Sequence, residues 1–464
     1  MSKVVDEVLQ SGKYHVYPEY KDSGVDWLGN IPFHWEKSRI GFEASIKARL
    51  GWKGLKADEY VEDGYIFLAT PNIKGSEIDF NNVNYITKFR YDESPEIKIN
   101  VGDVLVTKDG STTGTCNIVR KLPSPATVNS SIAVIRPIRN LVSEYLYYFF
   151  LSPYTQSVIK LMQGGMGVPH LFQADLCEFN ILLPPMNEQR TIAAFLDYET
   201  ARIDRLIAQQ QRLIELLKEK RQAVISHAVT KGLNPNAPMK NSGIEWLGQV
   251  PEHWDICLIK YKCDDITDGA HTSPETEGGQ ELFVSIKDIK DGVIDFERAL
   301  LTSSESYQHL VKSGCQPFAG DILFSKDGTI GQTAVTPDGI SFVVASSLII
   351  IRPNRSVVRP SFLNFLLQSC ATKEQVESFV KGAALRRLSI QNLLKVFGVF
   401  PSLYEQDAIS GYLETTLAHY SELESKAFQA ISLMQERRTA LISAAVTGKI
   451  DLRGWTPPVE EAAA

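Results

Sequence analysis

The chain has 464 residues, of which 44% are hydrophobic and 22% charged, and its formal net charge is −7. This composition is typical of globular protein, and the length predicts two to four domains. The negative net charge argues against an indiscriminate, histone-like binder of nucleic acid. It leaves specific binding open, because the local charge on a binding face sets its affinity for phosphate.

The six cysteines are scattered and form no C-x-x-C pair, and the eight histidines show no metal-ligand spacing. Neither a zinc site nor a redox motif is therefore indicated, and core thiols in a reducing cytosol are the simpler explanation. The first residues lack the apolar core of a signal peptide, and no uncharged apolar run reaches about 18 residues. We expect a cytoplasmic protein without a membrane span.

An internal duplication is the clearest feature of the sequence. Residues 24–36 recur as residues 243–255, with seven of thirteen positions identical. Further matches follow in the same order, at an offset that drifts only from 219 to 216 or 217. The later pairs are 78–80 with 294–296, 102–110 with 320–328, 130–137 with 346–353, 188–189 with 405–406, and 219–234 with 436–451. Such self-similarity predicts two copies of one structural unit.

In chain order, the pattern predicts six segments. They are an N-terminal extension (1–20), a first globular domain (21–183), a long helix (184–234), a linker with a second globular domain (235–400), a second long helix (401–453) and a C-terminal tail (454–464). Short apolar runs separated by Gly, Pro, Asp and Asn predict strands and turns in both globular domains. Residues 141–151 and 362–368 have helical apolar spacing. Each globular domain is therefore expected to be α+β.

The two long helices are predicted from residues 187–229 and 405–446, which contain no proline and only one glycine, Gly411. About 43 residues at 1.5 Å each give a helix on the order of 65 Å long. Both stretches carry a heptad of apolar positions, which requires a partner helix. The expected seam consists of Leu196, Ile203, Leu206, Gln210, Leu213, Leu217 and Val224 in the first helix, and Leu413, Tyr420, Leu423, Ala427, Ala430, Met434 and Leu441 in the second.

The simplest partner for each helix is its own repeat. Because the second domain lies between the helices in sequence, we expect an antiparallel coiled-coil pair with pseudo-two-fold symmetry and a domain at either end. The alternative is that each helix packs only on its own domain. Two similar domains on one spacer suit DNA, where related modules read half-sites at a fixed separation. The copies differ between their shared anchors, so the expected target is bipartite and asymmetric.

Candidate DNA contacts are the side chains that can bind phosphates or base edges. Some lie in a basic, Gly-containing stretch, some in a turn after a strand-like run, and some at repeat-related positions. These residues are Lys47, Arg49, Lys53, Asn72, Lys74, Lys108, Thr112 and His170 in the first copy, and Lys287, Lys326, Thr329, Arg386 and Arg387 in the second. A solvated basic face and a purely structural turn are the competing explanations. Trp27, His34, Trp35 and their counterparts recur at identical spacing, so they are expected to be structural.

A search for chemistry finds no phosphate-binding loop, no dinucleotide fingerprint and no Asn-Pro-Pro-aromatic motif. Glu96-Ile97-Lys98 superficially fits the end of a nuclease metal site, but the second copy has no counterpart. A stand-alone nuclease would depend on this tripeptide alone. We therefore expect no catalytic centre, no metal and no cofactor in this chain.

The ordered motifs resemble the specificity subunit of type I restriction–modification enzymes. They are Trp-Leu-Gly followed by Pro-x-His-Trp, Gly-Asp-(Val/Ile)-Leu, the Pro-Pro to Glu-Gln stretch at 184–189, and residues 438–451. The resemblance covers about residues 21–453. The second helix departs from it, because Pro401-Ser402-Leu403-Tyr404 replaces the paired prolines.

The resemblance implies two target recognition domains separated by helices that dock two modification subunits. Those partners would methylate adenine with S-adenosylmethionine, and restriction subunits would supply ATP- and Mg-dependent translocation and cleavage. On the helices, the residues expected to face partners are Glu188, Gln189, Arg202, Arg205, Glu405, Gln406, Arg437 and Arg438. The alternative is that these residues only form a solvated surface. A duplicated coiled-coil scaffold for protein interactions, without sequence-specific DNA binding, is the alternative from another class.

Overall fold

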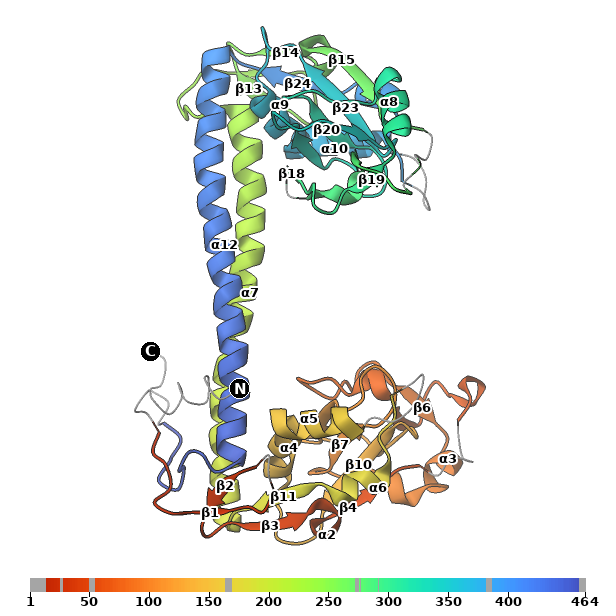
Figure 1. The fold of residues 1–464 in the computed structure, drawn as a ribbon, viewed down its shortest axis with the longest axis vertical. Coiled ribbons are helices and arrows are strands. Elements are labelled where there is room, and N and C mark those ends of the chain that lie inside the picture. The colour runs from red at the N-terminus through yellow and green to blue at the C-terminus, as the bar shows by residue number, and fades with distance from the viewer. Residues whose placement is uncertain are drawn as a thin grey trace. The chain divides into compact units, whose positions relative to one another are not determined.

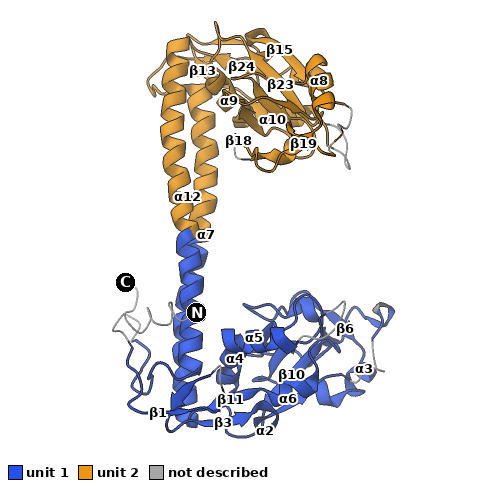
Figure 2. Cartoon of the chain, viewed as in Figure 1, with its two compact units in different colours: residues 1–210, 429–464 blue, residues 211–428 orange. Residues whose placement is uncertain are grey.

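The computed structural model describes residues 14–25, 28–49, 55–162, 169–271, 275, 277–290, 292–380 and 386–458. The chain divides into two compact units, which Figure 2 shows in different colours. Unit 1 comprises residues 1–210 and 429–464, and unit 2 comprises residues 211–428. Within the described ranges, no helix is both long and apolar enough to cross a bilayer.

Unit 1 contains a domain built on two small sheets (Figure 1). The central sheet is antiparallel in the order β4-β10-β7-β8, and the second sheet has the order β6-β5-β9 with β5 and β9 parallel. All four residues of β7 are buried, so both faces of the strand are covered. The strands are β4 (Ala44–Lys47), β5 (Tyr65–Leu68), β6 (Asn84–Ile86), β7 (Val104–Thr107), β8 (Cys116–Ile118), β9 (Ala126–Val128) and β10 (Ile132–Pro137).

Unit 2 repeats this topology. Its central sheet has the order β15-β23-β20-β21, and its second sheet has the order β19-β16-β22 with β16 and β22 parallel. The strands are β15 (Cys263–Asp268), β16 (Glu281–Val284), β19 (Leu300–Thr302), β20 (Ile322–Ser325), β21 (Thr333–Val335), β22 (Phe342–Val344) and β23 (Leu348–Pro353). The duplication predicted from the sequence is therefore confirmed at the level of strand order.

Helices cover the sheets in both units. The predicted helical segments correspond to α4 (Ser143–Leu151) and α9 (Pro360–Gln368), each followed by a second helix, α5 (Pro153–Met162) or α10 (Cys370–Phe379). The shorter helices are α2 (Ile40–Glu43), α3 (Lys88–Asp92), α6 (Gln173–Glu178), α8 (Ser304–Lys312) and α11 (Ile390–Leu393). The remaining antiparallel strand pairs are β1 (Tyr20–Asp22) with β2 (Asn30–Pro32), β3 (Glu36–Arg39) with β11 (Asn180–Leu183), β12 (Met239–Asn241) with β13 (Gln249–Pro251), β14 (Asp255–Leu258) with β24 (Phe397–Phe400), and β17 (Ile289–Lys290) with β18 (Val293–Ile294).

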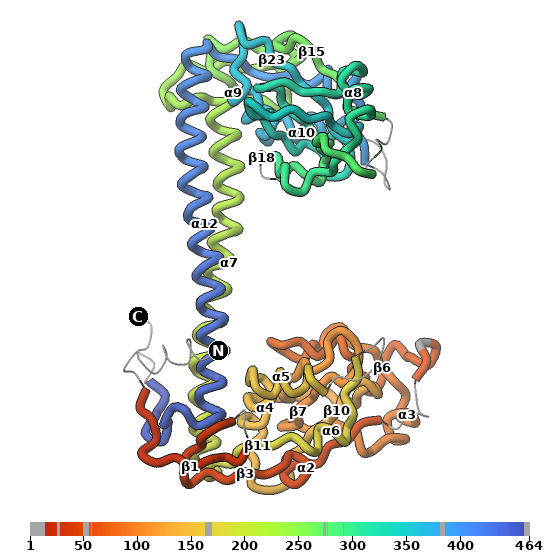
Figure 3. The backbone as a smooth tube through the Cα atoms, in the orientation of Figure 1, coloured from red at the N-terminus to blue at the C-terminus, as the bar shows by residue number. Residues whose placement is uncertain are grey.

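The two long helices are α7 (Met186–Lys231) and α12 (Leu403–Val446). They lie side by side within each unit (Figure 3). In unit 1, Arg438 forms an ion pair of 3.2 Å with Asp204. In unit 2, the contacts are Lys218 with Glu424 at 3.8 Å and Arg221 with Ser421 at 3.0 Å. In unit 2, the residue number rises on one helix as it falls on the other, so the pairing is antiparallel, as predicted.

The seam between the helices differs from the expected one at two positions. Leu196 and Ile203 are buried as predicted, but Leu206 and Leu213 are each 40% exposed. Ile207 packs against the core of unit 1, and Ile214 is 6% exposed in unit 2. The buried stripe of α7 therefore runs through Ile207 and Ile214, one residue beyond the expected Leu206 and Leu213.

The two chain ends contribute to unit 1. Tyr17 is 2% exposed and belongs to its core, and the backbone of His15 pairs with that of Asp451. Trp455 packs edge-on against Phe195 of α7, with ring centroids 5.5 Å apart. The described parts of the predicted extension and tail are therefore packed structure.

Burial in β8 raises the pKa of the Cys116 thiol to about 12. Only the thiolate reacts with alkylating agents, and at pH 8 about one Cys116 side chain in ten thousand would carry that charge. Iodoacetamide is therefore expected to leave Cys116 unmodified in the folded chain, as measured by peptide mass spectrometry. The guanidinium-unfolded chain is the control and should react fully. Rapid modification of the folded chain would contradict this burial.

Candidate nucleic-acid interface

In unit 1, backbone pairing brings several predicted contact residues to one end of the central sheet. Strands β4 and β7 both pair with β10, with Lys47 opposite Val134 and Thr107 opposite Ile132. The carboxyl ends of β4 and β7 therefore lie beside the start of β10. The amide of Lys108 donates to the carbonyl of Ser131 at 2.7 Å, which fixes the residues that follow β7 at this end.

A tight turn follows β7 at this end of the sheet. Gly110 has φ +87°, a conformation that favours glycine, and the hydroxyl of Thr107 donates to the carbonyl of Thr112. The Asp109 carboxylate bonds to the ring of His170, whose segment is attached by a backbone bridge to Asp109. The structural explanation of the turn is thus correct for its backbone, while the side chain of Thr112 remains exposed.

Unit 2 builds the same end with different side chains. The amide of Lys326 donates to the carbonyl of Ser347 at 2.9 Å, and Asp327 forms an ion pair of 3.2 Å with Arg387. Thr329 is exposed and its carbonyl accepts from Ser325 at 2.6 Å. Two further predicted residues lie at the surface of unit 2. These are Lys287, which is exposed, and Arg386, which bonds to Glu377. At equivalent ends of the two sheets, the turn is therefore bound to a second segment of the chain. That segment carries His170 in unit 1 and Arg387 in unit 2.

Three predicted DNA contacts are buried and have partners within their own domain. The side chain of Arg49 is 1% exposed, with its guanidinium 5.9 Å from the Phe67 ring centre, and burial lowers its pKa. Asn72 accepts from the amide of Ala69 at 2.8 Å and caps a short turn. Lys326 is 3% exposed and ion-paired with Asp268. The sequence indicated their polarity but not their side-chain partners.

The remaining predictions have mixed outcomes. Lys47 is exposed at the end of β4. Lys74 forms an ion pair of 2.9 Å with Asp79, so its charge is largely satisfied within the chain. Lys53 lies outside the described residues. None of these placements tests DNA contact, which remains a prediction.

Of the Glu-Gln pairs at the helix starts, all but the half-buried Glu405 are buried, which corrects the prediction that they face outward toward partners. Glu188 is 6% exposed and accepts from the indole of Trp35 at 3.1 Å, from the hydroxyl of Tyr17 and, at 2.9 Å, bonds the ring of His34. Gln189 is fully buried and accepts from the amide of Val142 at 2.9 Å. These side chains attach the domain to α7.

The second copy repeats the attachment. Glu405 accepts from the indole of Trp254 at 3.1 Å and bonds the ring of His253 at 2.9 Å, and Gln406 accepts from the amide of Arg359 at 2.8 Å. A sequence signal existed, because the His-Trp and Glu-Gln pairs recur together in both copies. The predicted partner-facing residues that do lie on the helix surface are Arg202, Arg205 and Arg437, while Arg438 is engaged with Asp204.

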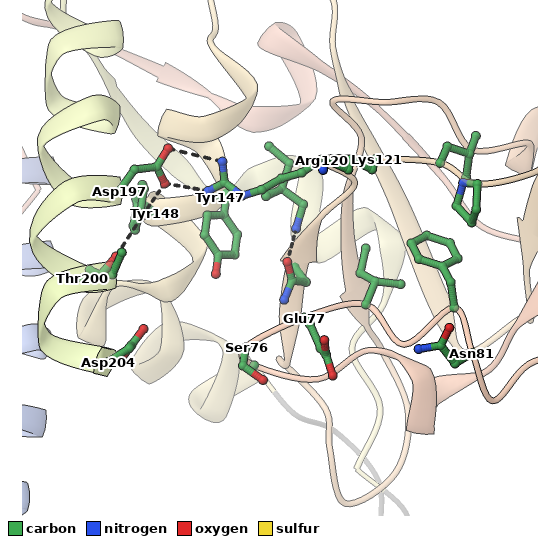
Figure 4. Close-up of a pocket in the computed structure, with 18 of the residues that line it drawn as sticks. Ser76, Glu77, Asn81, Arg120, Lys121, Tyr147, Tyr148, Asp197, Thr200 and Asp204 are labelled. Carbon is green, nitrogen blue, oxygen red and sulfur yellow. Dashed lines mark hydrogen bonds and ion pairs between the residues drawn. The ribbon is translucent and has the colours of Figure 1, made fainter. Parts of the chain in front are cut away.

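A cavity of about 1050 Å³ lies between the unit 1 domain and its helices (Figure 4). Arg120 reaches across it and forms two bonds with Asp197 of α7, at 2.6 and 3.2 Å. The hydroxyl of Tyr148 donates to the same carboxylate at 2.6 Å. The cluster is thus a second polar attachment of the domain to the helix. Across the described ranges, no group of three or more His, Cys, Asp or Glu side chains is placed to hold a metal ion.

Comparison with known proteins gives a consistent result. A family model described as the type I restriction modification DNA specificity domain matches residues 42–216 and 271–432. The MjaVIII type I restriction enzyme specificity subunit of Methanocaldococcus jannaschii is 25% identical over 434 residues, covering 91% of this chain and 94% of that protein. The EcoBI specificity subunit of Escherichia coli is 24% identical over 361 residues, covering 75% of this chain and 73% of that protein.

A solved structure has the same fold. A chain from a study of complex assembly and conformational transition of the type I R-M system has a TM-score of 0.70 at 17% identity. The match covers 90% of this chain and 98% of that one. At this identity the likeness concerns the fold alone.

Proposed function

Since the chain belongs to the family of type I restriction–modification DNA specificity subunits, we propose that it selects a bipartite, asymmetric DNA target, with each globular domain reading one half. The observation that carries this proposal is the repeated sheet end, which keeps its backbone in both units and changes its side chains. A constant frame with different side chains is what reading two different half-sites requires.

The proposal assigns the chemistry to partner subunits. Two modification subunits would dock on the chain and methylate adenine with S-adenosylmethionine, and restriction subunits would use ATP and Mg. The chain itself would be non-catalytic and cytoplasmic and would carry no cofactor. Exposed Arg202, Arg205 and Arg437 are the helix residues that we propose for partner contact.

Mapping adenine methylation by long-read sequencing tests the role directly. Cells that carry this gene with its neighbours are compared with a deletion of this gene alone, and with the deletion complemented by the full chain. We expect one split, asymmetric methylated motif to disappear on deletion and to return on complementation.

Persistence of every methylated motif would contradict the specificity role and favour the scaffold alternative. The purified chain alone is expected neither to methylate nor to cleave DNA. Methylation by the lone chain would overturn the assignment of catalysis to partners.

A further inference from the structure

The two central sheets have the same register, so their residues can be equated one by one. Lys47 of β4 pairs with Val134 of β10, and Thr267 of β15 pairs with Ile350 of β23. The strands on the other side of β10 and β23 have the same register, because β7 and β20 pair with equivalent positions of β10 and β23. The position after Lys47 in unit 1 therefore corresponds to the position after Thr267 in unit 2.

These next positions differ in charge. Unit 2 has Asp268, whose carboxylate bonds to the ammonium of Lys326 and lies 3.2 Å from the ring of His271. Unit 1 has Ala48 at the equivalent place. Lys326 thus has a carboxylate partner inside its own domain. For the corresponding Lys108, the equivalent position carries an alanine, which has no charge to offer.

Among the residues that the structure describes, Lys108 has no carboxylate counterion. The residue is only 8% exposed, and among the described side chains no carboxylate lies within ion-pair distance of its ammonium. The nearest acid in sequence, Asp109, is engaged by His170. Keeping a poorly solvated ammonium unpaired costs free energy, which an anion bound at that place would offset.

The surroundings of Lys108 suit a phosphate. The exposed hydroxyl-bearing side chains of Ser111 and Thr112 lie in the same turn, and the exposed Lys47 ends β4, two strands away at the same end of the sheet. A lysine with small hydroxyl side chains beside it is a common arrangement for DNA phosphate contacts. In unit 2 the same place is neutralised by Asp268.

We infer that Lys108 contacts a DNA phosphate in the first domain, and that Asp268 suppresses the equivalent contact of Lys326 in the second. The inference rests on the proposed function. The residue at the equivalent strand position, Ala48 in unit 1 and Asp268 in unit 2, then determines whether the lysine of that unit can bind a phosphate.

The test is the salt dependence of DNA binding by the full chain. A fluorescent mixed-sequence duplex is titrated between about 0.05 and 0.2 M potassium chloride, and log K is plotted against log salt. Each phosphate contact contributes a slope of about 0.9, so Lys108→Ala should lower the slope by about that amount and weaken binding about eightfold at 0.1 M salt. Lys326→Ala should change neither value.

A reciprocal exchange separates charge from folding. Ala48→Asp should reproduce the loss seen for Lys108→Ala, Asp268→Ala should raise the slope by about 0.9, and Lys108→Arg should retain the wild-type slope. Circular dichroism of each variant checks that the fold is kept. Equal losses for Lys108→Ala and Lys326→Ala, or no change for Ala48→Asp and Lys108→Ala in a folded chain that binds DNA, would overturn the inference. Failure of the wild-type chain to bind the duplex at low salt would instead count against the proposed function.

Discussion

Replacing Glu188 with alanine is expected to destabilise unit 1 by about 3–5 kcal/mol. The carboxylate accepts from the indole of Trp35 and the hydroxyl of Tyr17, which are 0% and 2% exposed. Burial, and then the neighbouring carboxylate, raise the pKa of Tyr17, so its hydroxyl stays protonated as a donor at neutral pH. Alanine would leave both donors buried without an acceptor. In thermal unfolding, the midpoint of the unit 1 transition should fall by roughly 10 °C.

Glu405→Ala is the matched control, because the second copy lacks a tyrosine donor to this carboxylate among its described contacts. Glu405 accepts from Trp254 and bonds to His253, whose side chain is 58% exposed and can turn to water. The expected loss is therefore smaller, about 1–2 kcal/mol. Hydrogen exchange locates each effect, since Glu188→Ala should reduce protection in residues 17–35 and leave 250–254 unchanged. Equal losses in the two variants would contradict a special role for Tyr17.

The sequence predicted the parts of the fold that depend on repetition and local pattern. The duplication gave the correspondence of the two α+β domains, and the proline-free stretches gave α7 and α12 to within a few residues. Strand order could not be predicted, because the pairing of β4 with β10 joins segments that are far apart in the chain and have no local signal.

The candidate site divides in a similar way. The turn with Lys108 and Thr112 was placed correctly after a strand, because the end of β7 determines its position. Arg49 and Asn72 were misjudged, because a polar side chain is buried or exposed according to partners such as Phe67 and Ala69. Glu188 was misjudged for the same reason: the resemblance implied a partner-facing helix surface, but the side chains that bind Glu188 lie in residues 17–35.

Ile203→Lys is expected to destabilise unit 1 by at least about 3 kcal/mol, because the ammonium would enter a core that the isoleucine fills at 4% exposure. Leu206→Lys should cost about 1 kcal/mol or less, since Leu206 is 40% exposed and a lysine stem can cover the same surface. The two substitutions introduce the same side chain into the same helix, three residues apart, so the change in net charge is matched. Lysine is at least as good a helix former as isoleucine, so a large loss for Ile203→Lys cannot come from helix propensity.

The unfolding midpoints of the two variants, measured by circular dichroism, therefore show which side of α7 its partner helix covers. The seam formed by Ile203 and Ile207 predicts a large loss for Ile203→Lys alone. The heptad first expected from the sequence, which includes Leu206, predicts large losses for both, because each leucine or isoleucine would then be a buried knob. A near-neutral Ile203→Lys would contradict both arrangements and would mean that α7 does not pack on α12 at this level.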